Sequence, residues 1–295
     1  MMNIYFTIFE LMVLVLAIMA VHHAWQRGAH VVWRLVAGML FGVLLEWATI
    51  RQLDAYEYGR FLFMVADVPI VIGVSWGLII YSAMLFSDAT SLPRWVRPVL
   101  DGLLALNIDL VTDAVAIRLG MWDWGQGLSF EYFGVPWGNF WAWFWVVSSF
   151  SAAIRLLTRP QNWFGRWLAP LLAIVVGTLA VVGTNALIVY ILMPAHLYEV
   201  SVAAVIFGAL LLIVALRPKL HVKQIGVVET GTSAALSGGV PAAFHLYFLL
   251  VGLISGALFN PPFLLIVSLL MLGVAWVLHR MHQMFFQQGS FFKTS

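Results

Sequence analysis

Residues 101–145 read DGLLALNIDLVTDAVAIRLGMWDWGQGLSFEYFGVPWGNFWAWFW. The first half is an apolar segment of helical length that carries aspartates, and the second half is a loop rich in aromatic residues. Six of the fourteen tryptophans of the chain lie between Trp122 and Trp145. An ionisable side chain costs roughly 2.5–3.5 kcal/mol at the centre of a bilayer, whereas aromatic faces shelter positive charge. Acids and rings together inside a membrane therefore indicate a functional site.

The composition places this stretch in an integral membrane protein. Hydrophobic residues make up 63% of the 295 residues, charged residues 9%, and the mean hydropathy is +0.97, far outside the range of soluble proteins. The absence of cysteine excludes disulfides, iron–sulfur clusters and thiolate zinc sites. No basic run indicates a nucleic-acid partner, and the N-terminal apolar segment lacks the basic flank of a cleaved signal peptide.

Nine apolar segments are long enough to cross the ~30 Å core of a bilayer. They cover residues 4–25, 32–50, 64–86, 98–118, 137–157, 168–192, 198–216, 242–260 and 262–279. Eight is the alternative, if the first segment or one of the last two does not cross. We expect an all-α polytopic transmembrane bundle that forms one domain over residues 1–295, with a cytoplasmic loop over residues 217–240.

The basic residues predict the orientation of this bundle. Twelve of the fifteen fall in connections after odd-numbered segments or in the C-terminal tail: Arg27, Arg34, Arg94, Arg97, Arg155, Arg159, Arg166, Arg217, Lys219, Lys223, Arg280 and Lys293. The opposite side holds Arg51, Arg60 and Arg118. The positive-inside rule then places the N-terminus outside and the C-terminus in the cytoplasm, and we expect the bacterial inner membrane.

Polar residues of several segments fall at a similar depth toward the outer side, which predicts a shared cavity. They are Glu46, Asp67, Asp109, Asp113, Asn139, Asn185 and Glu199. Asp109 and Asp113 are four residues apart and share one helix face. Two carboxyls so close in a low dielectric do not both ionise easily, so one is expected to stay protonated and serve as a general acid. The alternative is that they pair with Arg118 or Arg51.

Other candidate residues each have a structural alternative. Glu46 either takes part in chemistry or pairs with Arg51, and Asn139 either contacts substrate or caps a helix. Trp122, Asp123 and Trp124 are expected to form a lid, whereas tryptophans in general also form interfacial belts. The tryptophans at 137, 141 and 145 form one stripe along a helix. This stripe either packs against other helices or forms a wall of the ligand site. The segment DAYEYGRF, residues 54–61, is either a solvated loop or a source of contacts through Tyr58 and Arg60.

The histidines give no sign of a metal centre. None forms the facing pair that a b-type haem needs, and no HxxxH or HxxHH cluster is present. Oxygen-activating metal chemistry is therefore not supported, and we expect neither metal nor cofactor.

The run over residues 109–143, from Asp109 through Tyr132-Phe133-Gly134-Val135-Pro136 to Trp143, resembles the signature of integral-membrane carotenoid biosynthesis proteins. A second stretch, from Glu46 through residues 56–60 to Trp76, resembles an upstream element of that family. Together they cover about residues 46–145. Characterised members are carotenoid 1′,2′-hydratases, so the resemblance implies that water adds to the terminal double bond of an acyclic carotenoid end, such as that of lycopene, γ-carotene or a bacterioruberin precursor.

The resemblance also implies roles for the candidate residues. Asp109 or Asp113 would donate a proton, and the other carboxyl or Glu46 would position water. The substrate contacts and the rings around the cation would come from Trp122, Asp123, Trp124, Tyr132, Asn139, Trp141, Tyr58 and Arg60. The expected partners are a long isoprenoid, membrane lipids and other enzymes of the pathway. The alternatives are an isoprenoid or carotenoid cyclase that uses the same cation, and a proton-coupled transporter or lipid-binding protein.

Overall fold

The computed structural model describes residues 3–53, 56–125, 131–158, 162–217 and 231–291. Over these ranges it holds nine α-helices: α1 (Ile4–Gln26), α2 (Ala29–Leu53), α3 (Ile70–Asp88), α4 (Arg97–Arg118), α5 (Trp137–Leu157), α6 (Ala169–Leu187), α7 (Tyr198–Leu216), α8 (Gly231–Ile254) and α9 (Phe263–Phe291). The π-helical turns η1 (Phe164–Leu168) and η2 (Ile188–Leu192) extend α6, and the 3₁₀ turn η3 (Ala257–Phe259) follows α8. The expected all-α polytopic bundle is confirmed.

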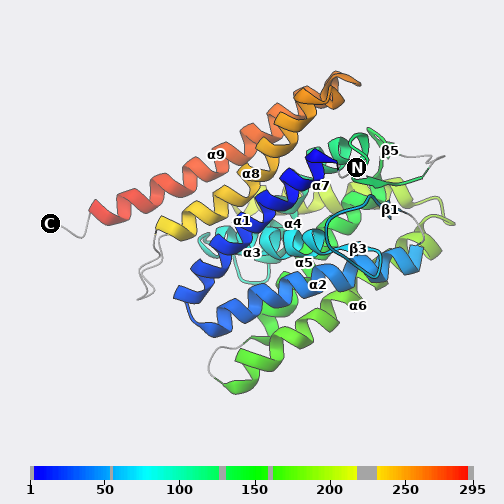
Figure 1. Cartoon of the computed structure of the whole chain (residues 1–295). Helices are drawn as coiled ribbons and strands as arrows, with labels where there is room; N and C mark the ends of the chain where they lie inside the picture. Colours follow the sequence, from blue (N-terminus) through cyan, green and yellow to red (C-terminus); the bar gives the residue numbers. More distant parts are fainter. Residues whose placement is uncertain (1–2, 54–55, 126–130, 159–161, 218–230, 292–295) are drawn as a thin grey trace.

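Its charged residues and lower hydropathy distinguish α4 from the other helices. Eight helical segments of the described chain, one of them α6 with its π-turns, are long and apolar enough to cross a membrane. The remaining helix, α4, carries Asp101, Asp109 and Asp113 between two arginines. It nevertheless packs between α3, α5, α8 and α9, so the bundle encloses its most polar helix (Figure 1).

Six two-residue strands lie at one end of the bundle, which we call the strand end (Figure 1). The hairpins β2–β3 (Met64–Val65 with Val68–Pro69) and β5–β6 (Glu131–Tyr132 with Val135–Pro136) precede α3 and α5. The third pair joins β1 (Glu57–Tyr58) to β4 (Trp122–Asp123). This pairing brings the connection after α2 against the connection after α4.

Two expected helix starts differ from the structure by six residues or more. The third segment begins at Ile70 and not at residue 64, because Ala66 and Asp67 have positive φ and turn the chain into the β2–β3 hairpin. The eighth begins at Gly231, within the range expected to be a loop. Its first turns are built from small residues that fit close helix contacts: a Cβ on Gly238 would lie 2.7 Å from His279 Nδ1. Such a sequence has little hydropathy to mark it as helical.

The contact between α2 and α3 is unusually close because both helices carry glycines four residues apart. Gly38 and Gly42 of α2 face Gly73 and Gly77 of α3. A Cβ on Gly42 would lie 2.8 Å from the carbonyl oxygen and 3.0 Å from the Cα of Gly73, closer than side chains tolerate. Small residues at this spacing let helix backbones approach in membranes. One turn after Gly42, this approach brings Glu46 of α2 to the side chain of Trp76 of α3.

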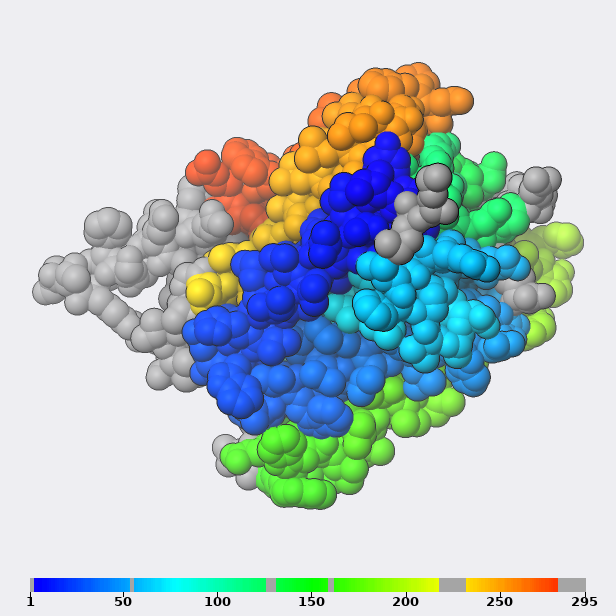
Figure 2. Space-filling view, viewed as in Figure 1, coloured from blue at the N-terminus to red at the C-terminus, as the bar shows by residue number. Residues whose placement is uncertain are grey.

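The segment between α2 and α3 is anchored on α1. Phe61 stacks on Phe6 of α1 with ring centroids 4.7 Å apart, and the backbone NH of Leu62 donates to Glu10 Oε1 at 2.7 Å. In the space-filling view the segment forms a sky-blue cover beside the dark-blue α1 (Figure 2). On its other side α1 packs on α8, where the Tyr247 hydroxyl donates to the Tyr5 carbonyl at 2.6 Å. The cover closes the strand end of the bundle.

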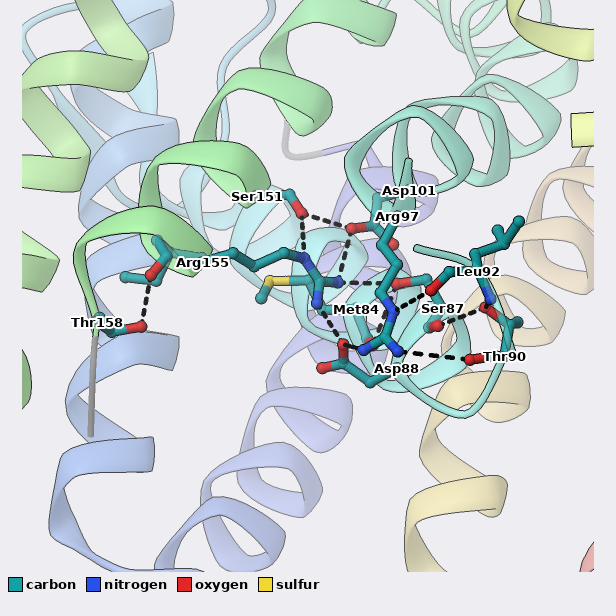
Figure 3. A network of polar contacts seen from close by, with 11 residues as sticks. Met84, Ser87, Asp88, Thr90, Leu92, Arg97, Asp101, Ser151, Arg155 and Thr158 are labelled. Carbon is teal, nitrogen blue, oxygen red and sulfur yellow. Dashed lines mark hydrogen bonds and ion pairs between the residues drawn. The ribbon is translucent and has the colours of Figure 1, made fainter. Parts of the chain in front are cut away.

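A network of ion pairs holds the opposite end, which we call the arginine end (Figure 3). Arg155 of α5 reaches the buried Asp101 of α4 at 3.0 Å and also contacts Asp88 at the end of α3. Arg97 binds Asp88 at 2.9 Å, and Ser151 donates to Asp101 at 2.5 Å. Asp101 is therefore part of a structural contact between helices.

Arg51 and Arg118 were predicted to lie on the side opposite to Arg97 and Arg155, and both lie at the strand end. Arg51 binds Asp67 of the β2–β3 hairpin at 3.3 Å, and Arg118 donates to the carbonyls of Phe133 and Asn260 at the strand end. Four residues used for the predicted orientation, Arg159, Lys219, Lys223 and Lys293, lie outside the described residues.

Candidate active site

A cavity of about 450 Å³ lies within the bundle toward the strand end. Helices α1 to α8 contribute to its walls, and the β1–β4 pair covers it through Tyr58 and Trp122. Its polar groups include Glu46, Asp113 and Asn139, and the rest of the wall is mainly aromatic and aliphatic. None of the described residues that line it is basic. The expected shared cavity thus contains carboxyls without a neutralising arginine or lysine.

Asp109 and Asp113 face α5 from α4, and both are fully or almost fully buried. The amide nitrogen Nδ2 of Asn139 lies 3.1 Å from Asp109 Oδ2 and 2.6 Å from Asp113 Oδ2. Both carboxyls thus lie against the same buried amide nitrogen. Two charged carboxylates at such a site would repel each other, which favours a protonated carboxyl in the pair. Asp113 lines the cavity, whereas Asp109 lies behind it.

The structural alternatives for these residues are wrong. Arg118 donates to main-chain carbonyls and Arg51 to Asp67, so neither neutralises the aspartate pair. Asn139 lies in the first turn of α5, where the cap position is occupied by Pro136, and its amide points at the carboxyls. Among these residues the structure therefore forms a carboxyl–carboxyl–amide cluster, and Asp113 of this cluster lines the cavity.

Glu46 approaches the cavity from α2 and has three neutral donors. Trp76 Nε1 donates to Oε1 at 2.6 Å, and the Tyr58 hydroxyl donates to Oε2 at 2.8 Å. The Tyr56 hydroxyl donates to the same Oε2. Arg51 is engaged with Asp67 and not with Glu46, so the alternative pairing is wrong. This donor set holds a carboxyl in place and leaves it free to complement a positive charge in the cavity.

Tyr56 and Tyr58 turn their hydroxyls inward, so the interpretation of this segment as a solvated loop is wrong for these two residues. The β1–β4 pairing fixes Tyr58 opposite Trp122, and Tyr56 lies 4.7 Å from Trp124 between ring centroids. Burial, followed by the nearby Glu46 carboxyl, raises the pKa of both tyrosines well above the usual value. Both therefore remain neutral hydrogen-bond donors at physiological pH.

Tryptophans form the main aromatic surface of the cavity. Trp76 and Trp143 face each other from α3 and α5 with centroids 4.3 Å apart, and Trp122 and Trp124 contribute from the connection after α4. The indole nitrogens of Trp122 and Trp124 are buried and have no hydrogen-bond partner among the described residues. The expected lid therefore consists of these two rings, whereas residues 126–130 of the same loop lie outside the described residues.

Four residues expected to contact substrate lie elsewhere. Arg60 and Asp123 are exposed, and neither lines the cavity. Trp141 is buried in an apolar cluster with Ile188 and Val202. Tyr132 packs against Phe140 of α5 with centroids 5.3 Å apart, and burial together with Asp109 raises its pKa. Tyr132 and Asp109 are thus close enough to interact electrostatically, although neither lines the cavity.

The cavity wall differs in part from the set of residues expected from the sequence. Trp143 shares a helix with the predicted stripe at 137, 141 and 145 but points to a different side, and no spacing rule identified that side. Asn185, expected at the right depth, does line the cavity, whereas Asp67 and Glu199 do not. Their contacts depend on the β2–β3 hairpin and on how α6 and α7 pack, which helical periodicity alone does not reveal.

One side of the cavity opens toward the surface that would face lipid. Tyr190 of η2 and Met193 line the cavity, yet they are 66% and 46% exposed. Opposite them lies the end of α2, where Gln52 donates to the Val182 carbonyl at 3.0 Å. We call the opening at Tyr190 and Met193 the lateral mouth. Tyr190 and Met193 thus belong both to the cavity wall and to the exposed surface.

The described residues contain no group of three or more histidine, aspartate or glutamate side chains placed to hold a metal ion. The carboxyl cluster and the tryptophans instead combine a proton source with surfaces that stabilise positive charge. This arrangement suits protonation of an apolar substrate in a site shielded from bulk water.

Comparison with known proteins gives one match. Residues 2–218 match the family described as carotenoid biosynthesis protein, a range that includes every helix from α1 to α7. No curated protein and no solved structure matches the chain. Since the match covers most of the chain and all of the carboxyl cluster, the chain belongs to the carotenoid biosynthesis protein family.

Proposed function

We propose that this protein is a carotenoid 1′,2′-hydratase that adds water to the terminal double bond of an acyclic carotenoid end. The observation that carries the proposal is the aspartate pair bridged by Asn139 at the wall of an aromatic cavity. Family membership supports an isoprenoid substrate and a membrane setting. Neither a metal nor an organic cofactor is needed for this reaction, and water is the second substrate.

The reaction begins with proton transfer. The hydroxyl of protonated Asp113 gives its proton to C2′, and the two π electrons of the double bond form the new C–H bond. A tertiary carbocation remains at C1′, where a water oxygen donates a lone pair to form the C–O bond. The excess proton of that water passes to the Asp113 carboxylate. The product is a tertiary alcohol, and the acid is restored for another cycle.

The surrounding residues lower the energy of the cation. Asp109 and Asn139 hold Asp113 in position through the contacts described above. Glu46 supplies a carboxyl without a basic partner, and the faces of Trp76, Trp122 and Trp143 line the same space. Cation–π contacts contribute roughly 2 kcal/mol or more when they are shielded from water. The carotenoid end would enter by the lateral mouth, with the remainder of the polyene in the lipid.

The membrane setting extends the proposal. We place the strand end at the outer face of the bacterial inner membrane and the arginine end at its cytoplasmic face. The reason is that most basic residues were predicted to lie on the side of the arginine end. Other enzymes of the pathway are proposed as neighbours because substrate and product both remain in the bilayer.

The test is pigment analysis by liquid chromatography and mass spectrometry in a bacterial host that makes lycopene. The native chain, Asp113→Asn and Asp67→Asn are each expressed and quantified in the membrane. We expect a product heavier by one water for the native chain and for Asp67→Asn, whose carboxylate is exposed on the β2–β3 hairpin. Asp113→Asn should form little or none. Growth in ¹⁸O-labelled water should label the product.

Each result has a defined meaning. An oxygen derived from O₂, or full activity of Asp113→Asn, would contradict the proposed hydration. A product of unchanged mass that contains a new ring would show that the cation is captured by a neighbouring double bond, and the protein would then be a cyclase. An unchanged pigment profile with normal membrane levels would count against this carotenoid substrate and in favour of transport or binding.

A further inference from the structure

Trp124 separates two spaces of different character. It lines the aromatic cavity and also a depression of about 650 Å³ at the strand end. Among the described side chains, Trp124 is therefore the one that contacts both spaces.

The depression has the polar character of an aqueous surface. Arg118, Asp123 and Glu131 line it. Arg118 is held in place because its guanidinium donates to the carbonyls of Ala114 at 2.6 Å and Phe133 at 2.9 Å. Charged side chains of both signs retain water. Water is thus available on one side of the Trp124 ring, and the aspartate cluster lies on the other.

The two tryptophans of the lid carry indole N–H groups without hydrogen-bond partners among the described residues. The indole nitrogens of both Trp122 and Trp124 are buried. A buried polar group without a partner is unfavourable, and a water molecule with two or more polar neighbours would satisfy it. These two N–H groups therefore favour water at the cavity side of the lid.

A second opening is needed because the lateral mouth serves another purpose. That mouth, at Tyr190 and Met193, faces the lipid side and would be filled by the polyene during reaction. Each hydration consumes one water, which has to be replaced before the next reaction. The water must reach the cation by a route that the substrate does not block.

We propose that Trp124 controls the passage of water from the strand-end depression into the cavity, and so determines whether the carbocation is captured by water. The second half of this statement rests on the proposed hydratase function, whereas the first half does not. Without water, the cation would lose a proton from a neighbouring carbon to the Asp113 carboxylate. The electrons of that C–H bond would form a double bond, and the product would be an isomer of unchanged mass.

The water route is tested by thiol accessibility, since the chain has no cysteine. Ser75→Cys places a single thiol on the cavity wall at a buried position and closely matches the native side chain in size. The full chain is prepared in membrane fragments open on both sides and treated with a small, charged methanethiosulfonate reagent. The labelling rate is then compared with and without a second change at Trp124.

We expect Trp124→Ala to accelerate labelling of the introduced thiol by about tenfold or more, equivalent to about 1.4 kcal/mol in the barrier. Trp124→Phe should give a smaller increase and serves if the alanine variant does not reach the membrane. Trp143→Ala is the matched control, because it removes an indole from the cavity wall away from the depression. Unchanged rates in both Trp124 variants, or an equal increase in Trp143→Ala, would overturn the proposal.

Product analysis separates this inference from the proposed function. If the labelling pattern is as expected but lycopene-producing cells contain no hydrated product, the water route stands and the hydratase function fails. If the native chain forms hydrated product while the Trp124 variants leave labelling unchanged, the hydratase function stands and the gating role of Trp124 fails.

Discussion

At the scale of single residues, Asp109 and Asp113 share a helix face and an amide donor but differ in what lies on their other side. Asp113 lines the cavity, whereas Asp109 is fully buried behind it. We therefore propose Asp113 as the proton donor and Asp109 as the residue that positions it and shares its proton. A carboxyl that meets the substrate and one that does not should respond differently to replacement.

We predict that Asp113→Asn lowers turnover by about 10²–10⁴-fold, the usual contribution of a general acid, and that Asp109→Asn lowers it less. Initial rates of product formation in membranes, normalised to protein content, provide the measurement. The pH at half-maximal rate should shift in Asp109→Asn, because Asp113 then lacks its proton-sharing partner. Equal loss in both variants, with no change in the pH profile, would contradict this division of roles.

The two tyrosines bound to Glu46 predict how stability depends on pH. The pKa of Tyr56 and of Tyr58 is raised well above the usual value of about 10 by burial and by Glu46. The folded protein therefore retains these protons where the unfolded chain loses them. Their stabilising contribution is complete below about pH 10 and is lost as the pH rises through the higher folded pKa values.

The free energy of unfolding in detergent should accordingly fall above about pH 10, by at most about 1.4 kcal/mol per pH unit for each tyrosine. Tyr56→Phe and Tyr58→Phe should each make this decline less steep. Chemical unfolding at a series of alkaline pH values provides the test, and an identical slope in both variants and the native chain would contradict it.

At the scale of secondary-structure elements, the α2–α3 contact sets the position of Glu46. Gly42 and Gly73 allow the two backbones to approach, and the hydrogen bond between Glu46 and Trp76 lies one turn further along. Packing of the helices and placement of the carboxyl are thus determined by the same residues.

Gly73→Ala is expected to destabilise the protein by about 1–3 kcal/mol, as overpacking typically does, because its Cβ would lie 2.9 Å from the backbone nitrogen of Val43. Gly183→Ala on α6 is the matched control, since a Cβ there has no neighbour within 4 Å. Unfolding by a denaturing detergent in mixed micelles measures both. Similar stability of the two variants would show that the close contact contributes little.

Helical elements were more predictable from sequence than their connections. Hydropathy located all nine helices, because a bilayer requires long apolar segments. It missed the start of α8, where glycine and serine serve close packing, and it missed the β2–β3 hairpin before α3. The aspartate pair followed from i, i+4 spacing, but the inward turn of Tyr56 did not. That turn depends on β1 pairing with β4, a contact between residues more than sixty positions apart.

At the scale of the whole molecule, the bundle has two chemically different ends. The strand end carries the loops that cover the cavity, and the arginine end carries the network of Asp88, Asp101 and Arg155. From the basic residues we propose that the arginine end faces the cytoplasm.

Single cysteines in the cysteine-free chain test this orientation. Asp67→Cys lies on the β2–β3 hairpin, and Trp95→Cys, at a position 69% exposed, lies between α3 and α4. A membrane-impermeant maleimide should label the Asp67→Cys variant in intact cells and the Trp95→Cys variant only after the membrane is opened. The reverse pattern would show that the strand end faces the cytoplasm.

The polarity of α4 has a consequence for biosynthesis. Asp109 and Asp113 leave the ribosome before Asn139, the residue that later bridges them. Each aspartate disfavours insertion by the translocon by roughly 2.5–3.5 kcal/mol. On its own, α4 would therefore insert poorly into the membrane. We therefore expect the stable integration of α4 to depend on helices synthesised after it, and on α5 in particular, because α5 supplies Asn139.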